Sequence, residues 1–159
     1  MRVHIATDHA AFELKEFLVQ QLRAAGYDVI DHGAASYDPA DDYPPFILPC
    51  AEAVVAEPGS LGIVLGGSGN GEQIAANKVK GARAILAYNT EIAALGRQHN
   101  DANCLALGGR FVDQESGWQI VKTFLETPFS GDERHQRRVQ MLIDYEAERS
   151  SLDKGTACC

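Results

Sequence analysis

A run of glycines that ends in an acid is the segment whose residue types and spacing most clearly suggest chemistry. It reads Gly66-Gly67-Ser68-Gly69-Asn70-Gly71-Glu72 and follows an apolar stretch over residues 61–65. The backbone N–H groups of such a loop, placed at the start of a helix, can hold anionic oxygens, and a serine hydroxyl can join them. Glycines chosen only for a tight turn are the simpler explanation of the same run.

Glu72 stands at the start of the helix expected after this loop, and two interpretations of it are open. It could be a general base that moves a proton of a ligand, or an acidic residue that complements the helix dipole. The dipole lowers the pKa of such a carboxylate and burial raises it, so the sequence predicts two opposing effects on Glu72.

The glycine run matches neither of two common nucleotide-binding motifs. A P-loop requires Lys-Ser or Lys-Thr after its last glycine, where this chain has Glu72-Gln73. A dinucleotide fingerprint needs a third glycine where Glu72 stands, and it belongs after the first strand, where this chain has Thr7-Asp8-His9. The loop therefore predicts a turn that binds anionic oxygens without a nucleotide signature.

Further polar groups stand beside other apolar stretches. Asp8 and His9 follow residues 3–7, His99-Asn100 precedes residues 104–107, and Gly108-Gly109-Arg110 follows them. Each group follows or precedes an expected strand, so the fold could bring these side chains together. Taken singly, Asp8 and His9 could be only a capping pair, and His99 could be structural.

Three arginines, Arg134, Arg137 and Arg138, fall in one expected helix of a chain whose formal net charge is −8. Arg134 and Arg138 are four residues apart and share a helix face, whereas Arg137 could face either the site or solvent. The face could be a solvated basic surface or a phosphate clamp, because the guanidinium fork matches phosphate oxygens. The acidic balance disfavours nucleic acid and anionic membranes as partners.

The four cysteines form neither a C-x-x-C pair nor a zinc-like spacing. Cys50 and Cys104 lie in apolar stretches and are expected to be core thiols, whereas the adjacent Cys158 and Cys159 lie in the polar tail. No apolar run is long enough to span a bilayer, and the chain begins in an expected strand instead of a signal peptide. These features favour a reduced cytoplasmic protein.

The elements that must position these side chains alternate between strand and helix. Strands are expected over residues 3–7, 27–32, 61–65, 82–86 and 104–107, and helices over 12–25, 46–56, 72–77, 90–98, 114–125 and 132–149. This alternation predicts one α/β domain, residues 1–149, with a three-layer α/β/α Rossmann-like fold and a five-stranded parallel sheet. A flexible tail, residues 150–159, is expected to follow. Ligands of such sheets bind at the carboxyl ends of the strands.

Together the motifs resemble the ribose-5-phosphate isomerase B family, which also includes subunits of galactose-6-phosphate isomerase. The resemblance covers residues 1–145, and the matching stretches are Asp8-His9-Ala10, Asp42-Tyr43-Pro44, Gly67-Ser68-Gly69-Asn70-Gly71, Ile74-Ala75-Ala76-Asn77-Lys78, His99-Asn100, Gly108-Gly109-Arg110 and Arg134-His135-x-x-Arg138. Many members carry a cysteine base directly after the third strand, where this chain has Gly66. The chain is similar to a second branch, which has glycine there and a glutamate at the start of the next helix.

The resemblance implies an aldose–ketose isomerase of the pentose phosphate pathway that interconverts D-ribose 5-phosphate and D-ribulose 5-phosphate through an enediolate. It implies Glu72 as the base, and neither a metal nor an organic cofactor. The enediolate would be stabilised by Ser68 and by the N–H groups of Gly67, Gly69, Asn70 and Gly71.

The resemblance also implies roles for residues outside the loop. His99 would open the sugar ring with help from Asp8, Asn100 would hold the sugar, and Tyr43 would line the pocket. The phosphate would be clamped by His9, Arg110, Arg134 and Arg138. Members of the family are homodimers or tetramers with active sites shared across the dimer, so some of these residues are expected to act in a neighbour's pocket.

Three alternatives stay open at this stage. The same chemistry could serve another phosphorylated sugar, such as a tetrose, allose or galactose phosphate. A non-catalytic phosphosugar- or nucleotide-binding module on a flavodoxin-like fold would bind without turnover and would not need Glu72, His99 and Asp8 together. Redox flavin binding is disfavoured, because the acidic Thr7-Asp8-His9 turn is not a hydroxyl-rich phosphate loop.

Overall fold

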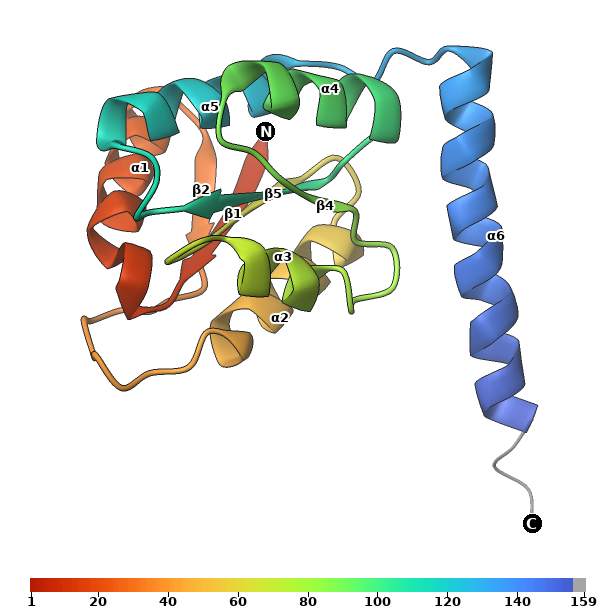
Figure 1. Cartoon of the computed structure of the whole chain (residues 1–159), viewed down its shortest axis with the longest axis horizontal. Coiled ribbons are helices and arrows are strands. Elements are labelled where there is room, and N and C mark those ends of the chain that lie inside the picture. Colours follow the sequence, from red (N-terminus) through yellow and green to blue (C-terminus); the bar gives the residue numbers. More distant parts are fainter. Residues whose placement is uncertain (156–159) are drawn as a thin grey trace.

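The central layer of the protein is a five-stranded parallel sheet (Figure 1). The computed structural model describes residues 1–155, with side chains described through residue 149. The strands, which follow the spatial order β2-β1-β3-β5-β4, are β1 (Arg2–Thr7), β2 (Asp28–Asp31), β3 (Leu61–Gly66), β4 (Ala84–Leu86) and β5 (Cys104–Gly108). The predicted fold class and strand number are confirmed.

Helices cover both faces of the sheet, as the alternation of elements predicts (Figure 1). One face carries α1 (Phe12–Ala24), α4 (Thr90–Asn100) and α5 (Gln114–Glu126), and the other carries α2 (Pro44–Ala56) and α3 (Asn70–Ala76). Successive side chains of a strand point to opposite faces, so β1 supplies Val3 and Ile5 to the first core and Ala6 to the second. β3 and β5 are buried along their whole length, which explains their unbroken apolar sequences.

The register of the three central strands aligns their carboxyl ends. Thr7 of β1 pairs with Leu65 of β3, and Gly66 of β3 pairs with Gly108 of β5. The polar segments that follow these strands therefore leave the sheet at the same edge.

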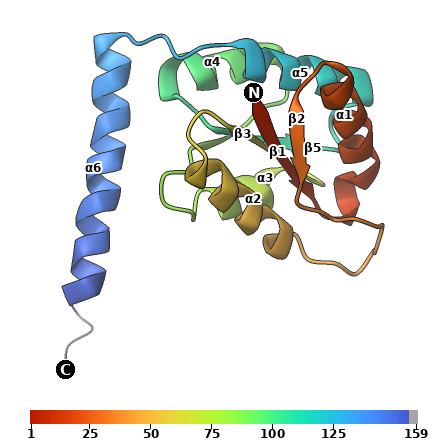
Figure 2. The same cartoon turned by 180° about the vertical axis from the view of Figure 1, so that it is seen from behind.

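The sixth helix, α6 (Glu133–Gly155), stands clear of the layered body in both views (Figure 1, Figure 2). It approaches the body near α4, and the Gly81 N–H donates to the Glu146 carboxylate at 3.0 Å. A groove of about 370 Å³ between helix and body is lined by Ile85, Leu142 and Ile143, among others. Among the side chains described on α6, the large apolar ones that are exposed are Met141, Leu142, Ile143 and Tyr145.

Two predicted helix ends were wrong. α4 continues to Asn100, past the predicted end at residue 98, so His99 and Asn100 lie in its last turn and not in the following loop. α6 continues past Arg149 to Gly155, so the predicted boundary between domain and tail falls inside a helix. Cys158 and Cys159 lie outside the described residues.

Cys50 and Cys104 are free, fully buried thiols of the second core cluster, as the sequence predicts. Burial raises the pKa of Cys104 to about 12, so this thiol is inert at neutral pH. Within the described part of the chain, no helix is both long and apolar enough to cross a bilayer.

Candidate active site

The polar segments after β1, β3 and β5 meet at the carboxyl edge of the sheet. Past the strand ends, the Gly109 N–H donates to the Gly66 carbonyl at 2.8 Å and the Arg110 N–H to the Gly67 carbonyl at 3.1 Å. These bonds fix the glycine loop against the turn after β5. The approach leaves no room for a side chain, because a Cβ on Gly108 would lie 2.6 Å from the Ser68 carbonyl oxygen.

Glu72 lies in the first turn of α3, and its side chain folds back beneath the glycine loop. The residue is only 4 % exposed. Its carboxylate occupies the space in which a side chain on residue 66 would stand, since a Cβ built on Gly66 would overlap it. A buried carboxylate thus replaces a side chain at the end of the central strand.

Burial raises the pKa of Glu72 above its usual range, and the nearby Asp8 carboxylate adds to the rise. Backbone hydrogen bonds from Glu72 itself and from Gly69 act in the opposite direction without cancelling the effect. Burial therefore outweighs the backbone hydrogen bonds that the Glu72 carboxylate accepts at the start of α3. A carboxylate with a raised pKa is a better proton acceptor, which suits a general base.

The glycine loop is held in one shape by side chains that flank it. Gly69 has a φ of 82°, and a Cβ there would lie 2.6 Å from Leu86 Cδ1, so both backbone and space require glycine. The Tyr43 ring covers Gly71, where a Cβ would lie 2.9 Å from its Cζ. Tyr43 therefore packs against the glycine loop.

Ser68 and Asn70 interact with each other inside the loop. Ser68 Oγ accepts hydrogen bonds from the Asn70 backbone N–H at 3.3 Å and from Asn70 Nδ2 at 3.2 Å. The Asn70 N–H is therefore engaged in this conformation, while the Ser68 hydroxyl proton can still be donated to a ligand. Tyr88, which sequence reasoning missed, donates its hydroxyl to the Ser68 carbonyl at 3.0 Å.

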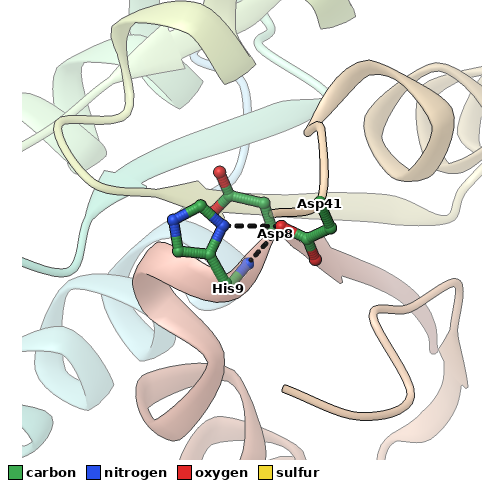
Figure 3. A group of neighbouring side chains, drawn as sticks. All are labelled: Asp8, His9 and Asp41. Carbon is green, nitrogen blue, oxygen red and sulfur yellow. Dashed lines mark hydrogen bonds and ion pairs between the residues drawn. The ribbon is translucent and has the colours of Figure 1, made fainter. Parts of the chain in front are cut away.

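Asp8, His9 and Asp41 form a cluster at the end of β1 (Figure 3). Asp8 caps the one-turn helix η1 (His9–Ala11) by accepting from the Ala10 N–H at 2.9 Å, so the capping interpretation holds for this residue. His9 Nδ1 bonds to Asp41 Oδ1 at 2.6 Å. The three residues offer ligand atoms within 4.8 Å of one another, but this short bond already engages one ring nitrogen and makes the cluster a histidine–carboxylate pair.

Arg110 lies over the glycine loop, where a Cβ on Gly67 would approach its guanidinium carbon to 3.2 Å. Arg110 and His9 both line a cavity of about 530 Å³, together with Phe12, Tyr37 and Asp113 among others. Two basic side chains beside a glycine loop form a suitable place for an anion such as phosphate.

His99 and Asn100 lie at the amino end of β5, so within one chain the fold does not bring them together with the groups at the carboxyl edge. Because β4 and β5 are parallel, α4 must run back between them and ends where β5 begins. The 5 residues of β5 then separate these side chains from the carboxyl edge by roughly 16 Å.

A second cluster forms where α4 ends and α6 begins. The His99 ring stacks on the ring of His135 with centroids 4.3 Å apart, and His135 Nδ1 bonds to Ser130 Oγ at 2.8 Å. Arg134 and Arg138 are exposed on α6, as is Arg137. Burial lowers the pKa of His135, and the nearby His99, Arg134 and Arg138 lower it further.

The predicted site residues thus divide into two groups in one chain. The group at the carboxyl edge contains Asp8, His9, Tyr43, Gly67, Ser68, Gly69, Asn70, Gly71, Glu72 and Arg110. The group at the other end contains His99, Asn100, Arg134 and Arg138.

Asp101 is a further residue that sequence reasoning missed. It ends α4 in the left-handed conformation with a φ of 45°, and its carboxylate pairs with Arg83 at 2.9 Å and Arg97 at 3.0 Å. Arg83 Nε also donates to the Asn100 and Asp101 carbonyls. An Asp directly after a helix is a weak signal for such a cap, because short polar side chains tolerate this conformation.

Comparisons with known proteins agree on one family. The family model described as Ribose/Galactose Isomerase matches residues 3–142. Ribose-5-phosphate isomerase B of Mycobacterium tuberculosis is 52 % identical over 146 residues, which cover 92 % of this chain and 90 % of that protein. A probable ribose-5-phosphate isomerase B of Mycoplasma pneumoniae is 44 % identical, covering 92 % of this chain and 96 % of that one.

A solved structure shares the fold. Ribose-5-phosphate isomerase B from Mycoplasma genitalium, crystallised with bound ribulose-5-phosphate, superimposes with a TM-score of 0.89 at 41 % identity. The match covers 92 % of this chain and 97 % of that one.

Proposed function

The chain belongs to the ribose/galactose isomerase family, and from this membership we propose that it interconverts D-ribose 5-phosphate and D-ribulose 5-phosphate. The observation that carries the proposal is the buried carboxylate of Glu72, with its raised pKa, beneath a glycine loop at the carboxyl edge of the sheet. A homologous structure with bound ribulose-5-phosphate supports the choice of sugar.

Glu72 removes the proton from C2 of the open-chain aldose and returns it to C1, through an enediolate. A second proton passes from the C2 hydroxyl to the C1 oxygen with help from Asp8. A positioned base of this kind contributes about 10²–10⁴-fold to the rate. Ser68 and the N–H groups of Gly67, Gly69 and Gly71 stabilise the enediolate oxygen, because donors fixed before the reaction need no reorganisation. The Asn70 N–H joins them when it leaves Ser68 Oγ. The phosphate binds beside His9 and Arg110, which keeps C1 and C2 in place at the carboxylate.

The active site is completed by a second copy of the chain. His99, Asn100, Arg134 and Arg138 lie at the end of the subunit remote from Glu72, on and beside a helix that stands clear of the body. The groove next to α6 and its exposed apolar residues offer a surface for a partner subunit. In a dimer these four residues reach the neighbour's pocket, where His99 opens the sugar ring and the arginines join the phosphate clamp.

The protein acts in the cytoplasm on this proposal. Cys50 and Cys104 belong to one core cluster and are both free, as is usual where thiols stay reduced.

The test is a panel of phosphorylated sugars assayed for turnover and, by calorimetry, for binding. Rapid conversion of ribose 5-phosphate with slower conversion of tetrose, allose and galactose phosphates supports the proposal. Turnover confined to another sugar would overturn the substrate assignment. Binding without turnover of any sugar would instead point to a non-catalytic binding module.

A further inference from the structure

Asp41 makes two hydrogen bonds to His9 through a single oxygen (Figure 3). Asp41 Oδ1 accepts from the His9 backbone N–H at 3.0 Å and bonds to His9 Nδ1 at 2.6 Å. Two anchors on one residue fix both the backbone and the ring plane of His9. With Nδ1 held in this way, Nε2 on the far side of the ring is left for a ligand (Figure 3).

The Asp41 carboxylate is well placed to keep His9 protonated. Its side chain is only 10 % exposed, and its other oxygen, Oδ2, is buried and accepts no hydrogen bond from the described residues. A desolvated carboxylate with so few partners is costly unless a cation pairs with it, so the ionised pair with the imidazolium is favoured.

The other charges around His9 do not reverse this effect. The hydrogen bond that His9 donates to Asp41 raises the pKa of His9 most, and burial lowers it. The charge of Asp8 raises this pKa further, and the charge of Arg110 lowers it. The Tyr37 ring meets the imidazole edge-on, with centroids 6.3 Å apart. The net direction is upward, which extends the protonated form to higher pH.

The segment that carries Asp41 is itself tied to the body. It follows β2, where the fully buried Lys15 donates to Asp31 Oδ2 at 2.7 Å and to the Ala34 carbonyl at 2.9 Å. Further along, the Asp41 N–H donates to the Asp38 carbonyl at 3.1 Å. These contacts lead the chain across the carboxyl edge and place Asp41 beside His9.

We propose that Asp41 is a positioning residue for substrate, which holds His9 as an oriented imidazolium whose Nε2–H is presented to the sugar phosphate. The inference rests on the proposed function, because it identifies the anion in the cavity of His9 and Arg110 with the substrate's phosphate. Asp41 itself touches neither the phosphate nor the reacting carbons. It acts on binding and not on proton transfer.

Two substitutions separate orientation from charge. In Asp41→Asn the amide oxygen can still accept from the His9 backbone and from Nδ1–H, so the ring keeps its direction but loses its counter-charge. In Asp41→Ala the ring loses both the hydrogen bonds that orient it and its counter-charge. Asp38→Asn is the matched control, since it removes a carboxylate charge from the same loop and keeps the oxygen that accepts from the Ala40 N–H.

The variants are compared by two measurements. The first is an NMR titration of the His9 ring in the absence of ligand. The second is kcat and KM for ribose 5-phosphate against pH, with inorganic phosphate as a competitive inhibitor.

Asp41→Ala is expected to raise KM and the inhibition constant of phosphate about tenfold, because this is the affinity that the loss of one charge-assisted hydrogen bond removes. The kcat at saturation should be retained. Asp41→Asn is expected to match wild type at acidic pH, where the imidazole is protonated without help, and to lose affinity at a lower pH than wild type does. Its His9 titration midpoint should fall, whereas that of Asp38→Asn should not.

An unchanged His9 titration in both Asp41 variants, or a loss of kcat with KM retained, would overturn the proposal. If the wild type converted no sugar phosphate, the proposed function would fail. The His9 titration and phosphate affinity would still decide whether Asp41 sets the state of His9. If Asp41→Ala does not fold, the isosteric Asp41→Asn carries the test alone.

Discussion

Gly66 and Glu72 share one volume, because a Cβ on Gly66 would overlap the Glu72 carboxylate. The last residue of the central strand and the first turn of the following helix are therefore a matched pair. The Glu72 carboxylate can lie under the loop only while residue 66 has no side chain.

Gly66→Ala is expected to displace the Glu72 carboxylate and to lower kcat toward the level of Glu72→Gln. Overpacking at this site should also destabilise the protein by about 1–3 kcal/mol. Adding Glu72→Ala should remove the clash, so the double variant should unfold at a higher denaturant concentration than Gly66→Ala alone. Additive effects in the double-mutant cycle would contradict the shared volume.

Glu72→Gln is expected to lower kcat by about 10²–10⁴-fold with sugar-phosphate binding kept, as measured by steady-state kinetics and calorimetry. The proposed base would act when deprotonated, so the raised pKa of Glu72 is expected to move the acid limb of the wild-type rate profile above the ordinary range of a glutamate. Asp8→Asn removes a charge that raises this pKa and should move the limb to lower pH.

The same pKa has a consequence for stability. A carboxyl group whose pKa is raised in the folded state binds protons more tightly there than in the unfolded chain. Its contribution to the free energy of unfolding therefore falls as the pH rises from the pKa of the unfolded chain through that of the folded state. Glu72→Gln has no buried carboxyl group to ionise, so it is expected to have a higher Tm than wild type at neutral pH. Equal Tm values there would argue against a desolvated ionised Glu72.

The proposed sharing of active sites between two subunits predicts complementation between two inactive variants. Glu72→Gln and the double variant Arg134→Ala/Arg138→Ala should each lose most activity alone. Refolded together in equal amounts, they should regain about a quarter of wild-type activity, since half the dimers are mixed and each mixed dimer has one intact site. An inactive mixture would show that the base and the arginines must come from the same chain.

Asp101 is expected to support the end of α4 that carries His99 and Asn100. Asp101→Ala loses the pairs with Arg83 and Arg97 and also places a strained residue at a φ of 45°. Asp101→Gly loses only the pairs, so it should be about 1 kcal/mol more stable than the alanine variant in denaturant unfolding. Glycine and alanine variants of equal stability would show that the backbone is not strained there.

The fold could be read from the sequence because its central strands are buried on both faces and give unbroken apolar runs, as in β3 and β5. Because Asp8, the glycine loop and Arg110 each follow a parallel strand, the sequence could also place them together at the carboxyl edge, where ligands of such sheets bind. The end of α6 was missed because its last turns are polar and carry no apolar period to mark where the helix stops.

The sequence left open whether His99 and Asn100 join the other groups within one chain, because a residue before a strand and a residue after one are equally close to it in sequence. Only the direction of α4 between two parallel strands shows that His99 and Asn100 lie at the amino end of β5, whereas Arg110 lies at its carboxyl end. Asp41 and Tyr88 were missed for another reason. Their roles depend on where loops pass in space, and an Asp in an acidic loop or a Tyr after a strand carries no periodic signal.

The position of His99 at the end of the subunit remote from Glu72 has a consequence for how much isomerase activity a cell obtains from a given amount of this protein. If each active site needs His99 of the neighbouring subunit, a newly made subunit is inactive until it forms a dimer. Output at low expression then grows with the square of subunit abundance and approaches proportionality only when nearly all chains are paired. A two-fold drop in synthesis would therefore cut flux by more than half in a cell that holds few copies.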